Sequence, residues 1–298
     1  MTRVLVLGRV RPGREIARHV AETSKALRAG GWKVEDHVVK RKRALRKRAG
    51  EAAKDGVDVV VAVGGDGAVL QVATAIAGSK TALGIIPLGT GNLLAGNLGV
   101  PKKPAAAVKT ILGRRRRRID VGRIEVDGTE RCFTVACGIG YDAEVMDATT
   151  PPQKLRWGKL AYLANAIGQT DELRAVRHVI TVDGRRIETE ASQVFVANQG
   201  KMLPIVAPRR RIKPDDGLLD VIVVRTSGTL PALIAGWDAM VQETLGKTDD
   251  GKVYRTQGRK IEIETEPGRL VEVDGSVIGS TPVSITVEPK ALSVLVPK

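Results

Sequence analysis

The sequence predicts an α/β protein in two parts: a doubly wound parallel sheet with helices on both faces, then a domain built mainly from antiparallel strands. Residues 1–121 alternate short apolar runs with amphipathic segments, the order typical of a parallel sheet. From residue 122 onward, short strand-like segments follow one another, separated by Asp-Gly and Gly-Arg turn signals. A length of 298 residues with 43% hydrophobic residues is sufficient for a core in each part.

The first part is expected to alternate buried strands with helices. Runs of β-branched and small apolar residues predict strands covered on both faces, and apolar positions at helical spacing predict helices. The expected strands are residues 4–7, 32–39, 59–63 and 82–86, and the expected helices are about 14–29, 40–54, 68–77 and 103–112, with a short helix after residue 92. Five consecutive arginines at 114–118 cannot be buried, so an exposed loop or an edge strand is expected there.

The second part is expected to be mostly strands with three helical insertions. The expected strands are residues 123–126, 132–137, 176–182, 186–196, 218–224, 260–265, 270–273, 283–287 and 292–296, and the expected helices are about 141–148, 154–170 and 230–245. Residues 154–167 mix apolar and basic side chains, which suits either a helix at a membrane interface or a helix packed on the sheet. The apolar loop 202–207 before three arginines is a second candidate for membrane contact.

The cysteines and the apolar segments indicate a cytoplasmic location. No apolar run approaches the roughly 20 residues of a membrane span, and the N-terminal apolar stretch is too short for a signal peptide. Cys132 and Cys137 are expected in one strand, on opposite faces and therefore unpaired. The three histidines are scattered, so we expect neither a zinc site nor a serine-histidine triad.

Two glycine-rich turns each join a buried strand to a helix. The sequence GGDG at 64–67 follows the first strand, and PLGTGN at 87–92 follows the next. Glycines let a phosphate approach the backbone closely, and a helix start offers N–H donors and a favourable dipole. Because neighbouring parallel strands end at one edge, the two turns predict a single phosphate-binding rim. The alternative interpretation is that the glycines only shape tight strand-helix turns.

The net positive charge lies entirely in the first part. Residues 1–121 hold 25 Lys and Arg against 9 Asp and Glu, whereas residues 122–298 hold 23 against 24. Such a surface attracts polyanions, including nucleotides, anionic lipid headgroups and nucleic acid. The basic run 40–48 suits either a solvated helix face or a contact with an anionic membrane or substrate. Specific nucleic-acid binding is not expected, because aromatic residues make up only 3% of the chain.

Together, the two turns resemble those of the diacylglycerol kinase catalytic domain family, which includes soluble bacterial lipid kinases and sphingosine kinases. The segments GIGYDA at 138–143, DDGLLD at 215–220 and VDG at 273–275 resemble later motifs of the same family, so the resemblance covers nearly the whole chain. It implies a nucleotide domain over residues 1–121, similar to NAD kinases and phosphofructokinases, and a β-sandwich acceptor domain over residues 122–289. It also implies that the last strand, about 290–298, returns to the first domain. NAD kinase activity itself is disfavoured, because no paired Asn-x-x-Asp follows the second turn.

The resemblance implies transfer of the γ-phosphoryl group of ATP, with Mg²⁺, to the hydroxyl of diacylglycerol or a similar lipid. The acceptor would lie at an anionic membrane surface, which implies peripheral contact. The nucleotide-binding residues that it implies are Gly64, Gly65, Asp66, Gly67, Gly89, Thr90, Gly91 and Asn92, with Arg9 in place of the family's usual Asn-Pro loop. Asp66 would also orient the Mg²⁺-nucleotide. A metal turn is implied at Asp216 with main-chain carbonyls near Lys213 and Leu218; the alternative is an Asp-Gly turn without metal.

The chain departs from the family pattern at the catalytic turn. The family usually has Asp-Gly-Glu, with the glutamate as proposed proton acceptor, and this chain has Asp274-Gly275-Ser276. On an extended strand Glu272, Asp274 and Ser276 would share one face, so Glu272 or Asp274 is expected to substitute. After GGDG, Leu70 and Gln71 stand where the family commonly has Asn-Glu, and Pro204-Ile205 replace glycines of a later loop. An active lipid kinase, a kinase for another hydroxyl acceptor and a nucleotide-binding relative with weakened catalysis all stay open, as does a homodimer.

Overall fold

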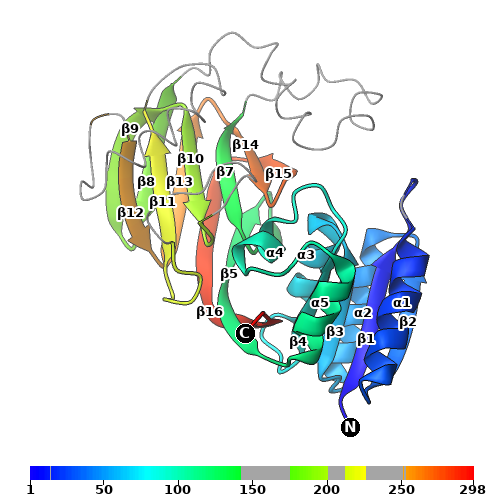
Figure 1. Cartoon of the computed structure of the whole chain (residues 1–298). Coiled ribbons are helices and arrows are strands. Elements are labelled where there is room, and N and C mark those ends of the chain that lie inside the picture. The colour runs from blue at the N-terminus through cyan, green and yellow to red at the C-terminus, as the bar shows by residue number, and fades with distance from the viewer. Residues whose placement is uncertain (14, 142–174, 201–211, 226–250, 252) are drawn as a thin grey trace. The chain divides into compact units, whose positions relative to one another are not determined.

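Two units are formed by the residues that the computed structural model describes, namely 1–13, 15–141, 175–200, 212–225, 251 and 253–298. One unit contains Met1–Val121 and Pro289–Lys298, and the other contains Gly122–Glu288. Figure 1 shows the chain coloured from its N-terminus to its C-terminus. No helix in the described ranges is long and apolar enough to cross a membrane.

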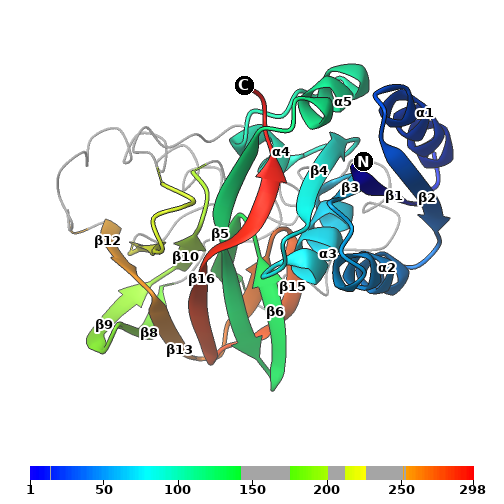
Figure 2. The same ribbon diagram turned by 90° about the horizontal axis from the view of Figure 1, so that it is seen from below.

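The first unit is a parallel sheet covered by helices on both faces. Its strand order is β2-β1-β3-β4-β16, and each neighbouring pair is parallel. The strands are β1 (Arg3–Arg9), β2 (Lys33–Val39), β3 (Val59–Gly64), β4 (Ala82–Pro87) and the end of β16 (Val283–Leu295). The helices are α1 (Ile16–Ala29), α2 (Lys42–Lys54), α3 (Asp66–Ile76), α4 (Leu93–Asn97) and α5 (Pro104–Leu112). Helices α1 and α5 lie on one face, and α2 and α3 lie on the other (Figure 2).

Burial explains why these residues form this unit. Every residue of β3 and β4 is buried, as expected for central strands with helices on both faces. Helix α1 buries Ile16, Val20 and Leu27 along one stripe, and α2 buries only Leu45, Ala49 and Ala52. The parallel sheet and the alternation of strands and helices that the sequence predicts are therefore confirmed.

The arginine run holds the end of the chain. Arg118 Nε donates to Lys290 O at 3.1 Å, and Arg115 Nη1 donates to Pro297 O at 3.1 Å. The Lys290 N–H in turn donates to the buried carboxylate of Asp120 at 2.6 Å. Arg114 lies over the ring of Trp32, 5.1 Å from its centroid. The run is exposed, as expected, and it also fixes the segment that completes the sheet.

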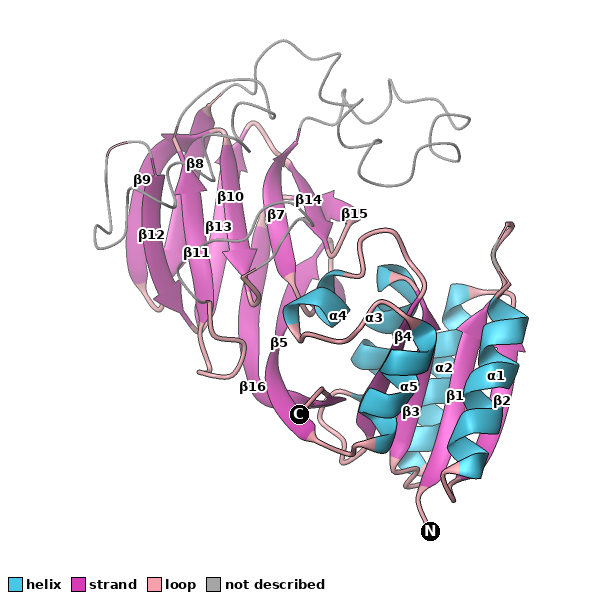
Figure 3. Ribbon diagram, in the orientation of Figure 1, coloured by secondary structure: helices cyan, strands magenta, loops and turns pink. Residues whose placement is uncertain are grey.

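The second unit is a sandwich of two antiparallel sheets. One sheet contains β6 (Thr129–Phe133), β5 (Arg116–Val126), the start of β16, β13 (Lys260–Glu266), β8 (Val176–Val182) and β9 (Arg185–Ala191). The other has the order β12 (Val253–Gly258), β11 (Leu219–Val224), β10 (Gln193–Ala197), β7 (Ala136–Tyr141), β14 (Leu270–Val273) and β15 (Ser276–Ser280). Figure 3 shows the strands of both units in magenta. Apolar side chains from the two sheets, such as Phe133, Ile180 and Val221, form one core.

Four of the predicted strands differ in detail from the structure. Residues 132–137 belong to two strands in different sheets, because the chain crosses between sheets at Thr134 and Val135; Cys132 and Cys137 are both buried and free. Residues 186–196 likewise divide at Ser192. Residues 283–287 and 292–296 form the single strand β16, which continues through Lys290 despite its φ of 50°. The sequence prediction missed β12 and β15, and the predicted helices 141–148, 154–170 and 230–245 and the loop 202–207 lie outside the described residues, apart from Tyr141 at the end of β7.

Candidate phosphate-binding site

The carboxylate of Asp66 joins the two glycine turns. Asp66 is the first residue of α3; its Oδ2 accepts the Asn92 N–H at 2.9 Å, and its Oδ1 accepts the Leu93 N–H at 2.6 Å. These N–H groups stand at the start of α4, where a helix has donors without internal partners. One side chain from the first turn therefore satisfies and fixes the backbone of the second.

The turns approach so closely that most of their glycines are required by packing. A Cβ on Gly65 would lie 2.9 Å from Gly89 Cα, and one on Gly89 would lie 2.6 Å from Gly65 Cα. A Cβ on Gly91 would lie 2.8 Å from Asp66 Oδ2. Gly67 differs, because a Cβ there would meet nothing within 4 Å and its φ is not positive. Packing thus explains Gly65, Gly89 and Gly91, whereas Gly67 leaves open space at the start of α3, where a ligand can approach the backbone.

Asn92 closes the second turn through its own side chain. Its Oδ1 accepts the Gly89 N–H at 2.8 Å, and its Nδ2 donates to Gly89 O at 2.7 Å. Asn92 has the left-handed conformation (φ 49°), which asparagine tolerates better than most residues. Its amide is therefore used inside the turn, while Thr90 is exposed at the apex of the turn.

The parallel sheet brings Arg9 to the same edge as both turns. Arg9 is the last residue of β1, Gly64 ends β3 and Pro87 ends β4, and these strands are parallel neighbours. Gly8 is paired with Val63, so Arg9 follows at the level of Gly64. The residues that the sequence predicts for nucleotide binding therefore share one edge of one sheet.

In the second unit, the carboxylate of Asp274 accepts hydrogen bonds from the backbone segment 134–136. Its Oδ2 accepts the N–H and the hydroxyl of Thr134, both at 2.8 Å. Its Oδ1 accepts the N–H groups of Val135 at 2.9 Å and Ala136 at 3.1 Å. Burial raises the pKa of Asp274, and the hydrogen bonds from these residues act in the opposite direction. All four partners are donors, so the geometry suits the ionised carboxylate.

Two other Asp-Gly pairs show that this use of aspartate is structural. Asp127, Asp183 and Asp274 each precede a glycine, and all three have φ between 43° and 49°. Each pair joins two antiparallel strands, as expected for Asp-Gly hairpin turns. The Asp183 carboxylate also accepts backbone N–H groups, from Arg259 and Lys260. Asp274 resembles these hairpin residues more than a group that is available for proton transfer.

The expectation that Glu272, Asp274 and Ser276 share one face is wrong. The chain reverses at Asp274-Gly275, so Ser276 lies on β15 opposite Val273, while Glu272 lies opposite Val277. Residues directly opposite each other in a sheet share a face, and adjacent residues of one strand do not. Val273 points into the sandwich core, and Ser276 shares its face. Glu272 is therefore on the opposite face of the hairpin from Ser276.

The predicted metal turn has the geometry of a simple aspartate turn. Asp216 is exposed, and its Oδ1 accepts the N–H of Leu218 at 3.1 Å. Gly217 supplies the positive φ of 76° that the turn needs, and Lys213 is exposed. Within the described ranges, no group of three or more His, Cys, Asp or Glu side chains is placed to hold a metal. Metal binding at this turn through main-chain carbonyls stays a prediction.

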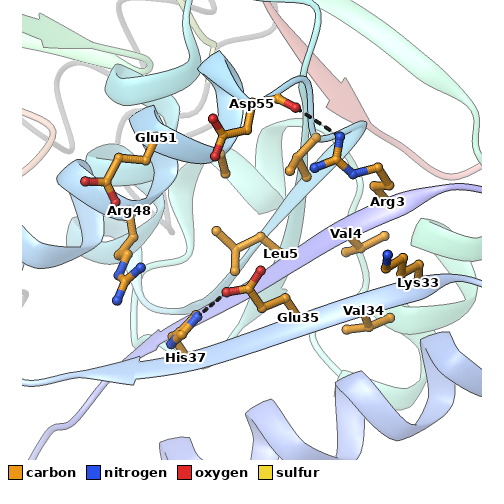
Figure 4. Close-up of a pocket in the computed structure, with 12 residues that line it drawn as sticks. Arg3, Val4, Leu5, Lys33, Val34, Glu35, His37, Arg48, Glu51 and Asp55 are labelled. Carbon is orange, nitrogen blue, oxygen red and sulfur yellow. Dashed lines mark hydrogen bonds and ion pairs between the residues drawn. The ribbon is translucent and has the colours of Figure 1, made fainter.

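A polar groove elsewhere on the first unit differs from the phosphate site. It has a volume of about 290 Å³ and lies between α2 and strands β1 and β2 (Figure 4). Arg3 Nη1 donates to Asp55 O at 3.0 Å, and His37 Nε2 lies 2.6 Å from Glu35 Oε1. Its charged lining is balanced between basic Arg3, Lys33 and Arg48 and acidic Glu35, Glu51 and Asp55. This balance gives the groove no preference for an anion such as a nucleotide.

Sequence reasoning missed the partners of both carboxylates. Leu93 takes part through its backbone N–H, and so do Val135 and Ala136, so their side-chain types give no signal. Thr134 also contributes a hydroxyl, but it is 140 residues from Asp274 in the sequence. The N–H groups at the start of α4 are capped by Asp66, which lies in another turn.

The fold is an α/β domain with two paired glycine turns followed by a β-sandwich, and the comparisons with known proteins identify the family. Residues 4–124 match the diacylglycerol kinase catalytic domain, and residues 134–296 match the YegS C-terminal NAD kinase β-sandwich-like domain. A Mycobacterium tuberculosis protein named diacylglycerol kinase is 30% identical over 256 residues, 83% of this chain and 79% of that one. The chain belongs to the diacylglycerol kinase family of lipid kinases.

Other relatives agree with this assignment. A Pseudomonas aeruginosa protein named "Probable lipid kinase YegS-like" is 31% identical over 85% of this chain and 81% of its own length. A Synechocystis protein, sll0036, is 31% identical over 87% of this chain, which spans 59% of that protein. A crystal structure from Bacillus anthracis strain Sterne, assigned to the diacylglycerol kinases, superposes with a TM-score of 0.82 at 26% identity, covering 99% of this chain and 95% of that one.

Substitution of Asp66 by Asn should separate its backbone role from a metal contact. Asparagine can accept only one of the two N–H groups, and its own NH₂ would face the other, which should cost about 1–3 kcal/mol. We expect ATP affinity, measured by calorimetry, to fall about tenfold both with Mg²⁺ and in excess chelator. A loss seen only with Mg²⁺ would contradict the backbone role. Asp55→Asn, at an exposed position on the same unit, is the control.

Substitution of Asp274 by Asn should destabilise the second unit. The amide would keep at most half of the accepting positions and would leave a backbone donor without a partner, at a cost of about 2–4 kcal/mol. Urea unfolding measures this, and Asp183→Asn is the matched control, because it is an Asp-Gly hairpin residue whose side chain is exposed. The structural interpretation predicts a smaller loss at Asp183, and equal losses at the two positions would contradict it.

Proposed function

We propose that the chain is an ATP-dependent lipid kinase that transfers the γ-phosphoryl group of ATP to the hydroxyl of diacylglycerol or a similar lipid. The observation that carries the proposal is the pair of glycine turns, which the Asp66 carboxylate holds together by hydrogen bonds. Gly67 leaves open space beside them, and the chain belongs to a family of lipid kinases. The acceptor belongs to a membrane, so the enzyme would work from the cytoplasm as a peripheral protein at an anionic membrane surface.

The described residues suit the binding of a nucleotide phosphate. Gly67 leaves open space at the start of α3, and the helix dipole and the N–H groups of a helix start favour negative charge there. Arg9 adds a cation at the same edge, and the exposed Thr90 offers a hydroxyl. Mg²⁺ bound with the nucleotide would supply neutralisation of the charge that develops on the transferring group. Asp66 uses two of about four acceptor positions for backbone bonds, so it keeps capacity to orient a metal-bound water.

The proposed reaction needs a proton acceptor for the lipid hydroxyl, and the position of the family's glutamate has no carboxylate. The family's glutamate position is Ser276, Asp274 is engaged by four donors, and Glu272 lies on the opposite face of the hairpin. Phosphoryl transfer depends mainly on positioning and electrostatic stabilisation, with little bond-making chemistry for the protein to do. General-base catalysis is worth roughly 10²- to 10⁴-fold, so its loss slows the reaction but does not remove it. The same observation favours the second candidate, a nucleotide-binding relative with weakened catalysis.

Purified chain with Mg²⁺ and radiolabelled ATP should give labelled lipid from a panel of long-chain alcohols, diacylglycerol included, in mixed micelles. Gly67→Ala is the control, because its Cβ would enter the open space without meeting any atom within 4 Å and should weaken labelling in a folded protein. The absence of labelled lipid from every alcohol in the panel would refute the kinase proposal.

Substitution of Ser276 by Glu should raise turnover by roughly 10²-fold, because it restores a carboxylate at the family's position. Ser276→Gln has a similar shape without a base and is the matched control, with no increase expected. If Ser276→Glu binds ATP as tightly as the natural chain and turnover does not rise, the deficit lies elsewhere, with Leu70 and Gln71 the next candidates.

A further inference from the structure

The ends of β1 and β2 form an exposed surface that combines aliphatic side chains with many cations. We define the basic edge as residues 9–11 and 38–43. Val10 is 50% exposed and Val38 is 37% exposed, which makes them two of the most exposed large apolar side chains among the described residues. The Val10 N–H donates to Val39 O at 3.0 Å, so the two segments adjoin. Lys40, Arg41, Lys42 and Arg43 follow directly and are all exposed.

The cations of the basic edge are placed where the protein itself favours negative charge. Helix α2 begins at Lys42, has no acidic residue in its first turn and has no side-chain hydrogen bond at its N-cap. The dipole of the helix favours anions at this end, so Lys42 and Arg43 are unfavourably placed in the isolated protein. Arg46, Lys47 and Arg48 extend the positive surface along α2, and residues 38–50 contain no Asp or Glu. An external layer of negative charge would relieve this repulsion.

The exposed side chains of Val10 and Val38 favour an anionic partner that also has an apolar layer. A free nucleotide or a nucleic-acid backbone offers phosphate charge but no apolar layer for Val10 and Val38. The interface of an anionic bilayer offers both, because the headgroups carry charge and the acyl boundary accepts aliphatic side chains. We propose that the basic edge docks on an anionic lipid bilayer with both valines seated among the headgroups.

The position of the basic edge fits the proposed lipid kinase function. The biological reason for docking on a bilayer rests on that function. The parallel strands β1 to β4 end at one edge of the sheet, so Arg9 and Val39 lie at the same edge as Gly64 and Pro87. Figure 3 shows these strands running in one direction. Docking through the basic edge therefore turns the phosphate-binding edge of the first unit toward the lipid, where an acceptor hydroxyl is located.

Sedimentation with vesicles tests the docking without any turnover. The full chain, without nucleotide, is mixed with phosphatidylcholine vesicles and with vesicles in which a third of the lipid is phosphatidylglycerol. We expect binding to the anionic vesicles that weakens with salt, and little binding to the neutral vesicles. Lys40→Gln, Arg41→Gln and Arg43→Gln together should weaken the partition about 100-fold at low salt.

The matched control removes the same charge from the opposite edge of the same unit. Lys25, Lys54 and Lys109 are exposed and lie near the C-terminal ends of α1, α2 and α5, which are at the far edge because these helices run against the strands. Lys25→Gln, Lys54→Gln and Lys109→Gln together should change the partition only a few-fold. A second variant, Val10→Ser with Val38→Ser, keeps every charge and should weaken the partition several-fold with an unchanged salt dependence.

Each outcome decides the proposal. Equal loss in the two triple variants, no loss in the valine variant, or no preference of the natural chain for anionic vesicles would overturn it. Tighter binding to a duplex oligonucleotide than to anionic vesicles would replace the bilayer with nucleic acid. Because no nucleotide is present, a chain that binds vesicles but transfers no phosphate refutes only the kinase proposal. An active kinase that ignores the vesicles refutes only the docking.

Discussion

The phosphate site depends on one carboxylate, that of Asp66, which accepts two backbone N–H groups from the neighbouring turn. The parallel sheet places the ends of β3 and β4 side by side, but strand pairing alone does not fix the loops beyond them. Asp66 supplies that constraint, and the contact between Gly65 and Gly89 removes the room for any other arrangement. If the start of α3 binds a phosphate as proposed, these contacts would fix the turn beforehand and lower the cost of ordering on binding.

The second unit uses the same chemistry for a different purpose. Asp274 accepts donors from three consecutive residues, 134–136, and so ties the β14–β15 hairpin to the crossing between β6 and β7. Asp183 does this with fewer bonds at another hairpin. Asp66, Asp183 and Asp274 each precede a glycine, and each uses its carboxylate to accept backbone N–H groups. An aspartate in a glycine turn is by itself weak evidence for catalysis, since the turn already accounts for its position.

The sequence predicted the first unit well because its signals are local. Buried runs such as 59–63 and 82–86 and the stripes of α1 and α2 depend only on neighbours in the chain, and the predicted elements match the structure closely. Predictions failed where long-range pairing decides the structure. Residues 132–137 look like one strand because every side chain there is suited to burial, yet the change of sheet at Thr134 is set by Asp274, 140 residues away. Glu272 and Ser276 were assigned to one face because Asp-Gly was treated as extended rather than as a hairpin turn.

The family resemblance implies nucleotide binding and proton acceptance together. In this chain the two properties would depend on different residues, and the Asp274-Gly275 hairpin concerns only the second. In the proposed kinase, nucleotide affinity would depend on residues 64–67 and 87–92, whose mutual hydrogen bonds and contacts lie within the first unit. Proton acceptance in the proposed kinase would depend on the side chain at position 276, and Glu272 lies on the opposite face of the hairpin from that position. Asp274 accepts four hydrogen bonds from residues 134–136, which hold the backbone of the turn. A substitution at Ser276 would therefore change the side chain at that position and leave the backbone in place. In the proposed kinase, the nucleotide-binding turns would therefore stay intact while the side chain at position 276 decides whether a general base is present.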